Sequence, residues 1–241
     1  MRIIKKLIFL LLFVILIIGL LIGCVFGIPG YNMYKDAIEK EPINEKVASI
    51  EKKKNYSKFS DLPEMYVNAV IATEDHRFYE HSGIDFISVV RAIYNDIKAK
   101  DFVEGGSTIS QQLAKNIYFT QERTGKRKIA ETLMASILDS TLSKEKIFEL
   151  YVNTSYFGDG YYTVKDACKG YFKKELKKMT DYECIMLAGI PNAPSVYAPT
   201  KNFDLTKKRA EHVIKKMVEN EYLTQEEADE ILKEGKSYAI H

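Results

Sequence analysis

The sequence predicts a mostly α-helical domain behind a single N-terminal transmembrane helix. Leu7 to Ile28 is an apolar run of 22 residues without a charge, which is long enough to cross a bilayer as a helix. Beyond residue 58, apolar residues recur at helical spacing and capping boxes mark helix starts, whereas few runs have the two-residue period of a strand. The roughly 210 residues after the anchor suffice for one domain with a proper core.

The N-terminal residues predict the orientation of this helix. Arg2, Lys5 and Lys6 precede the apolar run, and basic residues stay on the cytoplasmic side of a membrane. We therefore expect a single-pass protein of the cell membrane, with residues 1–6 in the cytoplasm, 7–28 as the transmembrane anchor, and the rest of the chain outside the cytoplasm.

Two alternatives compete with an uncleaved anchor. A cleaved signal peptide would have a shorter apolar run, followed by a small-x-small site that is absent here. A lipoprotein signal is suggested by Leu21 to Cys24, but the apolar run continues past that cysteine to Ile28. The uncleaved anchor is the favoured reading, and acylation of Cys24 stays open.

Composition argues against several functional classes. The net charge is only +2, which argues against a dedicated nucleic-acid binder. The three cysteines do not form a disulfide framework, and no Cys/His spacing suggests zinc. Residues 29–58 are polar and predict a partly helical juxtamembrane stalk, so we place the domain at residues 59–241.

An acidic residue lies at the end of the first predicted helix of the domain. Leu62, Tyr66 and Val70 follow one another at intervals of four, and the same interval leads to Glu74. Glu74 should therefore lie on the buried side of the helix, where lost solvation suits a carboxylate to accept a proton as a general base. Asp75 points elsewhere and is free to act as a structural hydrogen-bond acceptor. The alternative is a solvated acidic pair at a helix end.

A second helix is predicted over 86–97, with Arg91 on a different face from its apolar residues. A possible anion site follows this helix. Gly105 and Gly106 precede Ser107, and Thr108 with Gln111 forms a capping box. Free backbone N–H groups at such a helix start suit an anion. Gln111 and Lys115 share one face of this helix, and further cations follow at Arg123, Lys126, Arg127 and Lys128. The alternative is an ordinary basic surface loop.

A second carboxylate lies in the helix predicted over 127–142. Glu131 is four residues from Arg127 and shares its side of the helix with Met134 and Leu138. The alternative here is an intrahelical ion pair worth only about 0.2–0.5 kcal/mol. Further helices are predicted over 143–153, 162–172, 180–189, 205–220 and 224–234, and the proline-rich residues 192–199 predict an ordered loop.

Five separated segments resemble the peptidoglycan glycosyltransferases of glycosyltransferase family 51. They occur in the family's order, and the second is the most specific. The segments are Glu74 to Gly83 (EDHRFYEHSG), Gly105 to Asn116 (GGSTISQQLAKN), Arg127 to Glu131 (RKIAE), Glu149 to Gly158 (ELYVNTSYFG) and Leu187 to Ser195 (LAGIPNAPS).

The resemblance implies a lysozyme-like, two-lobed helical domain that polymerises lipid II into glycan strands. The growing chain would be transferred, with inversion, from undecaprenyl pyrophosphate to the 4-hydroxyl of an acceptor lipid II. The chain ends at residue 241, without room for a penicillin-binding transpeptidase domain, so we expect a monofunctional member. Expected partners are lipid II, the nascent glycan chain, the membrane, and cell-wall synthesis or division proteins.

The resemblance also implies roles for individual residues. Glu74 would be the general base, and Glu131 the second family carboxylate that orients the donor or holds a divalent metal, Mg²⁺ or Mn²⁺. The expected substrate-binding residues are Asp75, Arg91, Ser107, Gln111, Lys115, Arg123 and Arg127. One position departs from the family: Ala130 stands where some members have lysine, so either Arg127 or Lys128 supplies that charge or the phosphate site is weaker.

Two other functions remain alternatives at this point. A lysozyme-like hydrolase or lytic transglycosylase shares the fold type and the catalytic glutamate, but it needs no cluster of cations near a pyrophosphate. An inactive membrane-anchored scaffold for cell-wall proteins would need neither carboxylate. The cations between Lys115 and Lys128, together with both glutamates, favour synthesis.

Overall fold

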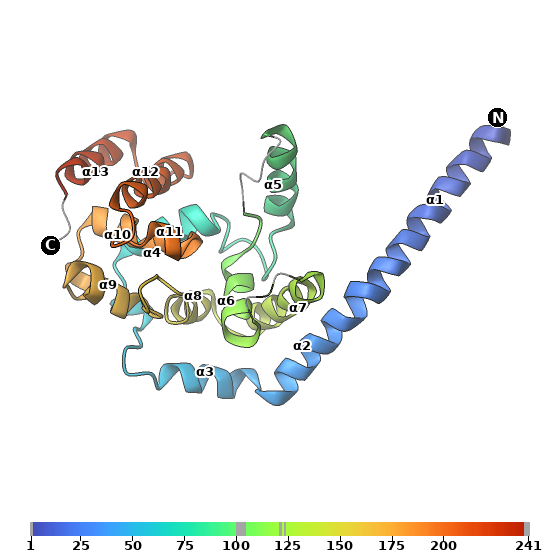
Figure 1. Cartoon of the computed structure of the whole chain (residues 1–241), viewed down its shortest axis with the longest axis horizontal. Helices are drawn as coiled ribbons and strands as arrows, with labels where there is room; N and C mark the ends of the chain where they lie inside the picture. The colour runs from blue at the N-terminus through green and yellow to red at the C-terminus, as the bar shows by residue number, and fades with distance from the viewer. Residues whose placement is uncertain (1, 100–104, 121, 123, 239–241) are drawn as a thin grey trace.

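The computed structural model describes residues 2–99, 105–120, 122 and 124–238, and none of these residues lies in a strand (Figure 1). The predicted mostly α fold behind one apolar N-terminal helix is confirmed. The α-helices are α1 (Arg2–Ile22), α2 (Ile28–Lys40), α3 (Ile43–Glu51), α4 (Glu64–Glu74), α5 (Phe86–Ala99), α6 (Ile109–Tyr118), α7 (Gly125–Thr141), α8 (Lys144–Val152), α9 (Val164–Phe172), α10 (Asp181–Gly189), α11 (Pro194–Tyr197), α12 (Phe203–Glu219) and α13 (Gln225–Ser237). A π-helical segment, η1 (Gly23–Gly27), joins α1 to α2, and three short 3₁₀ turns are η2 (Phe59–Asp61), η3 (Leu176–Lys178) and η4 (Ile190–Asn192).

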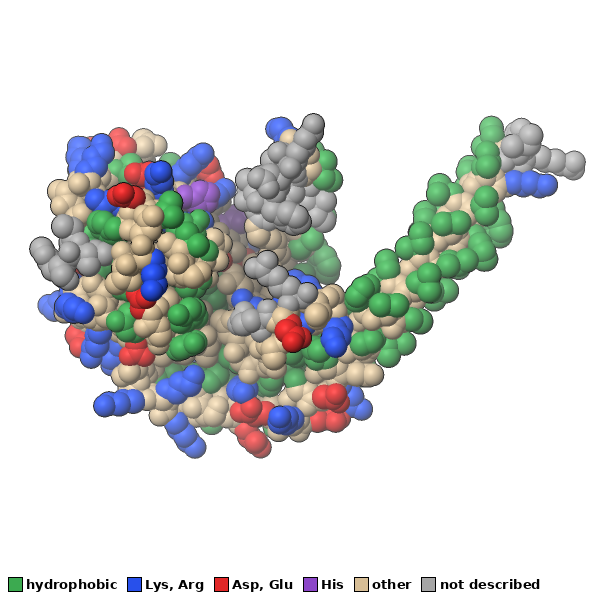
Figure 2. Space-filling model, viewed as in Figure 1, with side chains coloured by type: hydrophobic (Ala, Val, Ile, Leu, Met, Phe, Trp, Pro, Cys, Tyr) green, Lys and Arg blue, Asp and Glu red, His purple; other side chains and the backbone are tan. Residues whose placement is uncertain are grey.

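The N-terminal helix is long and apolar enough to span a membrane. The candidate span runs from Ile4 to Lys40 through the π-helical segment, and its most apolar 18-residue stretch is not buried within the protein. Figure 2 shows apolar side chains covering α1 along its length. This helix fits a single-pass membrane protein.

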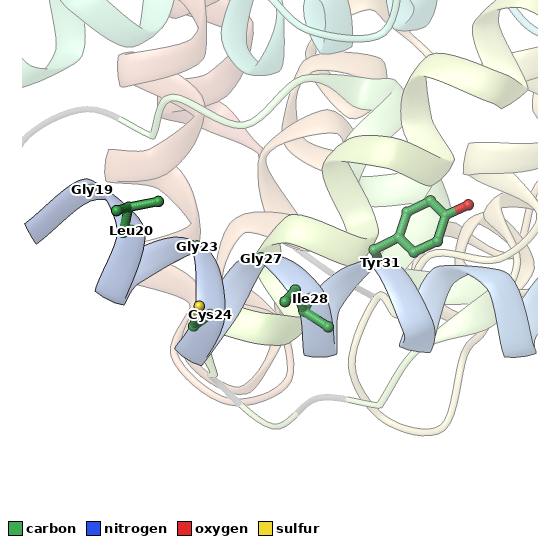
Figure 3. A pocket seen from close by; sticks show the side chains of 7 residues that line it. All are labelled: Gly19, Leu20, Gly23, Cys24, Gly27, Ile28 and Tyr31. Carbon is green, nitrogen blue, oxygen red and sulfur yellow. The ribbon is translucent and has the colours of Figure 1, made fainter. Parts of the chain in front are cut away.

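A shallow hollow lies on one face of this helix at the junction of α1 and α2. Gly19, Gly23 and Gly27 follow one another at intervals of four along it, and Leu20 and Ile28 complete its apolar wall (Figure 3). A Cβ added at any of the three glycines would meet no atom within 4 Å. Cys24 and Tyr31 also line this mostly apolar hollow.

The segment predicted as a stalk is helical and packs against the rest of the protein. Helix α2 lies along α7, and a Cβ added to Gly30 would lie 2.7 Å from the Lys126 carbonyl oxygen and 2.8 Å from Ile129 Cβ. Ile43 and Ile50 of α3 are buried in the main core. The domain boundary at residue 59 stays a prediction.

The helices of the domain form two groups. In one group α4 packs on α10 and α12, and α13 packs on α10 and α12. In the other group α6 packs on α7 and α8, while α2 covers α7. Figure 1 shows α4, α10 and α12 on one side of α6 and α7, with α5 standing above them. Figure 2 shows the surface hollowed between the two groups.

One predicted loop contains a helix. Pro194 occupies the first turn of α11, a four-residue helix within the segment predicted as an ordered loop over 192–199. Proline suits this position because a first-turn N–H has no partner within its own helix. The carbonyl of Ala193 then accepts hydrogen bonds from the N–H groups of Val196 and Tyr197.

Candidate active site

Glu74 is the last residue of α4, and its side chain is only 10% exposed. The helix places it on the face of Tyr66 and Val70, which are buried, as its spacing predicts. Gln112 of α6 donates a hydrogen bond from Nε2 to Glu74 Oε2 at 2.9 Å. Arg209 of α12 places Nη2 3.5 Å from Glu74 Oε1. The carboxylate is therefore held at the junction of the two helix groups.

Asp75 connects the end of α4 to the start of α6. The backbone N–H of Ile109 donates to Asp75 Oδ2 at 2.9 Å, and His81 Nε2 lies 2.9 Å from Asp75 Oδ1. The expected structural role as an acceptor is confirmed by this geometry. Both carboxylate oxygens are engaged within the protein, and a contact of Asp75 with substrate stays a prediction.

The loop between α4 and α5 is fixed against α7. Thr108 Oγ1 donates to the Gly83 carbonyl at 2.6 Å. Gly83 has φ +82°, and a Cβ there would lie 2.7 Å from the Ala135 carbonyl oxygen, so only glycine suits this position. Arg77 Nε lies 3.2 Å from Asp85 Oδ2, which also accepts a hydrogen bond from Ser88 Oγ.

Arg91 extends from α5 on an exposed face. Its Nη1 lies 3.0 Å from His76 Nε2, and its Nη2 donates to Ser88 Oγ at 3.0 Å. Burial and the Arg91 charge lower the pKa of His76, so the imidazole is neutral over a wider range of pH than a free histidine. The predicted substrate role of Arg91 remains untested by this geometry.

Five residues from three segments form what we call the anion cluster: Ser107, Lys115, Arg127, Lys128 and Glu131. Lys128 donates from Nζ to Ser107 Oγ at 2.8 Å and lies 3.5 Å from Glu131 Oε2. Arg127 pairs with the other oxygen of Glu131, whose side chain is 3% exposed. Cations thus outnumber the carboxylate, which leaves the cluster positive.

Lys115 lies within electrostatic reach of both glutamates. Burial lowers the pKa of Lys115, while the charges of Glu131 and Glu74 oppose that shift. Burial likewise lowers the pKa of Lys128. Lys115 also feels the charges of Arg127 and Lys128, and a partly desolvated cation beside two others is suited to bind a multiply charged anion.

The predicted substrate-binding residues are thus only partly brought together. Ser107, Lys115 and Arg127 lie in the anion cluster, whereas Arg123 lies outside the described residues. Gln111 is buried; its Oε1 accepts from the Thr108 N–H and its Nε2 donates to Thr132 Oγ1, both at 3.1 Å. These bonds fix α6 to α7, and substrate binding by Gln111 stays a prediction.

The position where some members of the resembled family have lysine lies inside the fold. Ala130 is fully buried, so the cations of this helical turn come from Arg127 and Lys128. Both contact Glu131, the candidate metal ligand. Within the described part of the chain, no three His, Cys, Asp or Glu side chains group as ligands. A carboxylate already paired with two cations does not fit a protein-held Mg²⁺ or Mn²⁺, and we derive no step through a metal.

Sequence reasoning missed two residues that contact Glu74. Gln112 lies next to Gln111 in the conspicuous polar run, and only one of the two was selected. Arg209 is 135 residues from Glu74 in the chain. Its signal was a charged side chain beside the apolar positions Ala210 and Val213, which are buried.

Comparison with known protein families identifies the family of this chain. A family model described as Transglycosylase matches residues 40–218. The chain belongs to the transglycosylase family. This membership confirms the resemblance to peptidoglycan glycosyltransferases and the predicted enzyme class.

Individual relatives of this transglycosylase are larger proteins. The chain is 42% identical over 188 residues to penicillin-binding protein 1A of Neisseria cinerea, covering 78% of this chain and 24% of that protein. It is 44% identical over 182 residues to penicillin-binding protein 1F of Bacillus subtilis, covering 76% and 25%. A crystal structure of penicillin-binding protein 1A from Haemophilus influenzae matches with a TM-score of 0.48 and 22% identity, covering 79% of this chain and 19% of that one. The chain spans about a quarter of the length of the curated relatives it matches.

Proposed function

We propose that this transglycosylase polymerises lipid II into peptidoglycan glycan strands. The growing chain, bound as the donor, is transferred from its undecaprenyl pyrophosphate to the 4-hydroxyl of an acceptor lipid II. Glu74 acts as the general base and the anion cluster binds the pyrophosphate. Family membership supports the reaction class, and the contacts described above support these roles.

The observation that carries this proposal is the position of the anion cluster relative to the end of the chain's membrane helix. Phe26 lies against the start of α7, where a Cβ on Gly125 would be 2.7 Å from Phe26 Cδ1. Arg127 and Lys128 follow within one helical turn of Gly125. Phe26 is close to the end of the 22-residue apolar run, so these cations lie near the membrane surface. A diphosphate attached to a membrane lipid is found at that depth.

The chemistry follows from the two parts of the site. Glu74 takes the proton of the acceptor 4-hydroxyl as that oxygen attacks the anomeric carbon of the donor sugar. The bond from that carbon to the diphosphate oxygen breaks, and the electron pair leaves with the diphosphate. Lys115, Arg127 and Lys128 lie where this negative charge develops, which stabilises the transition state. One displacement inverts the anomeric centre and needs no covalent intermediate.

The remaining expectations accompany this proposal. The basic residues before α1 support a cytoplasmic N-terminus, a transmembrane anchor over 7–28 and a catalytic domain outside the cytoplasm. Lipid II, the nascent glycan chain and the membrane are the proposed partners, together with cell-wall synthesis or division proteins. The diphosphate of the substrate is the group to which a divalent metal would bind.

The experiment is to give the detergent-solubilised full chain purified lipid II, with and without Mg²⁺. Formation of a polymer that lysozyme degrades supports the proposal. Release of fragments from intact sacculi, without polymer formation, would contradict it and indicate a hydrolase. If neither activity is detected, that result would contradict catalysis by this chain alone and would leave the scaffold alternative.

A further inference from the structure

The Glu74 carboxylate is held by two groups of different kinds. Gln112 donates a neutral hydrogen bond to Oε2 at 2.9 Å, whereas Arg209 places a positive charge 3.5 Å from Oε1. Glu131 differs, because Arg127 and Lys128 both pair with it. Glu74 therefore has one cationic partner among the ion pairs of the described residues, and that partner comes from α12, which packs on α4.

Arg209 is itself fixed by two contacts besides the one with Glu74. Its Nε donates to the Gly189 carbonyl at 3.3 Å, and its guanidinium lies 5.7 Å from the centre of the Tyr197 ring. Gly189 is the last residue of α10, where the helix dipole favours a positive charge. A Cβ on Gly189 would lie 2.9 Å from Arg209 Cγ, so this glycine leaves room for the arginine stem.

The ion pair between Arg209 and Glu74 differs from an ordinary solvent-exposed ion pair. The side chains of Arg209 and Glu74 are only 12% and 10% exposed, so water compensates neither charge fully. Arg209 has no partner from the anion cluster among its described contacts. Its positive charge lies beside Oε1, the Glu74 oxygen that accepts no hydrogen bond from Gln112.

We propose that Arg209 is a positioning residue for glycosyl transfer. Held by the Gly189 carbonyl and the Tyr197 ring, it orients the Glu74 carboxylate toward the acceptor hydroxyl and balances its charge before proton transfer. This inference rests on the proposed function, because it assigns Arg209 a role in the action of Glu74 as a base.

The test measures kcat and KM for lipid II polymerisation by the full-length protein. Arg209→Gln should lower kcat by about 100-fold with KM within about twofold, since misplacing a catalytic group mainly slows the chemical step. Arg209→Lys, which keeps the charge, should recover about tenfold of that loss. Lys208→Gln, at the exposed neighbouring position, is the matched control and should behave as wild type.

A second measurement distinguishes action through Glu74 from general damage. In a Glu74→Gln protein, adding Arg209→Gln should leave the residual rate within about twofold, because both changes affect one unit. Unchanged kcat in Arg209→Gln, or a further large fall in the double variant, would overturn the inference while wild-type polymerisation stands. If Arg209→Gln does not fold, the Arg209→Lys protein decides: wild-type kcat would overturn the inference. A wild-type protein that makes no polymer would overturn both this inference and the proposed function.

Discussion

Gly30 of α2 and Ile129 of α7 are in such close contact that no side chain fits at residue 30. A Cβ there would lie 2.7 Å from the Lys126 carbonyl oxygen and 2.8 Å from Ile129 Cβ. The membrane helix is thus packed directly on the helix that carries Arg127, Lys128 and Glu131. We infer that the depth of the anion cluster relative to the bilayer is set by this contact.

Gly30→Leu should therefore weaken use of a lipid-linked donor. The larger side chain pushes α2 away from α7, so we expect KM for lipid II to rise by about tenfold with a smaller change in kcat. Gly19→Leu is the control, since a Cβ at that position would meet no atom within 4 Å. Equal KM values for the two variants in the polymerisation assay would show that the contact does not set donor binding.

Donor binding should weaken at alkaline pH earlier than an ordinary lysine would allow. Burial lowers the pKa of Lys115 and of Lys128 below the usual lysine value, so both lose positive charge as pH rises toward that value. The dissociation constant for undecaprenyl pyrophosphate, measured by isothermal titration calorimetry between pH 7 and pH 10, should therefore rise with pH. Lys115→Arg should flatten this dependence, because arginine stays protonated throughout the range. An identical pH dependence in wild type and Lys115→Arg would contradict the assignment.

Removing the charge of Lys115 should cost affinity at neutral pH as well. Lys115→Ala should weaken pyrophosphate binding by about tenfold to a hundredfold, the loss of about 1.5–3 kcal/mol for a hydrogen bond to a charged group. Lys126→Ala removes a neighbouring exposed cation and serves as the control. A comparable loss in both variants would indicate general electrostatic attraction instead of a specific contact.

How far the sequence alone predicts this structure depends on the range of each interaction. Capping boxes at Thr108, Thr180 and Thr224 depend only on local sequence, and all three form. The position of Glu74 also follows from local spacing, because its helix continues a buried face. Arg209 could not be paired with Glu74 in this way, since that contact depends on how α12 packs on α4.

The segment predicted as a stalk contains a helical pattern of apolar residues that its polar composition masks. Ile43, Val47 and Ile50 recur at helical spacing within a charged segment, and the first and last are buried in the core. The polar average of residues 29–58 suggested a separate stalk, whereas these three positions determine where α3 packs. The depth of the anion cluster was likewise beyond the sequence, because it depends on the contact of α2 with α7.

A buried network that joins residues 51–59 to α8 should make stability depend on acid pH. Burial alone would raise the pKa of Glu149, but hydrogen bonds from Lys146, Tyr56 and the Phe59 N–H outweigh it and lower that pKa. Because the folded state holds this carboxylate with a lowered pKa, the stabilisation is present above the unfolded pKa and is lost as pH falls through the folded one. Glu149→Gln should reduce the free energy of unfolding by about 1–3 kcal/mol at pH 7. Denaturant unfolding in detergent, followed by far-UV circular dichroism at pH 7 and pH 4, should show a larger gap between the two proteins at pH 7; a constant gap would contradict the assignment.

Helix α5 presents an apolar face that should contact lipid. The side chains of Phe86, Val90 and Ile97 are 72%, 67% and 73% exposed. Three large apolar side chains exposed on one short helix form an unusual apolar surface. The chain contains no tryptophan, so a single introduced tryptophan reports its own surroundings. In the full-length protein in liposomes, brominated lipids should quench Phe86→Trp and should not quench Tyr162→Trp, which replaces an exposed tyrosine of a loop. Equal quenching at both positions would contradict membrane contact by α5.

The central claim is that Glu74 is the general base, and one substitution tests it most directly. Glu74→Gln keeps the size of the side chain and removes its ability to accept a proton, so polymer formation from lipid II should fall by about 10²- to 10⁴-fold. Glu80→Gln is the matched control, because Glu80 is exposed and pairs only with Arg77 among its described ion pairs. The two variants should have similar thermal stability, so that a difference in rate reflects chemistry. Polymerisation by a folded Glu74→Gln protein at the wild-type rate would contradict the claim.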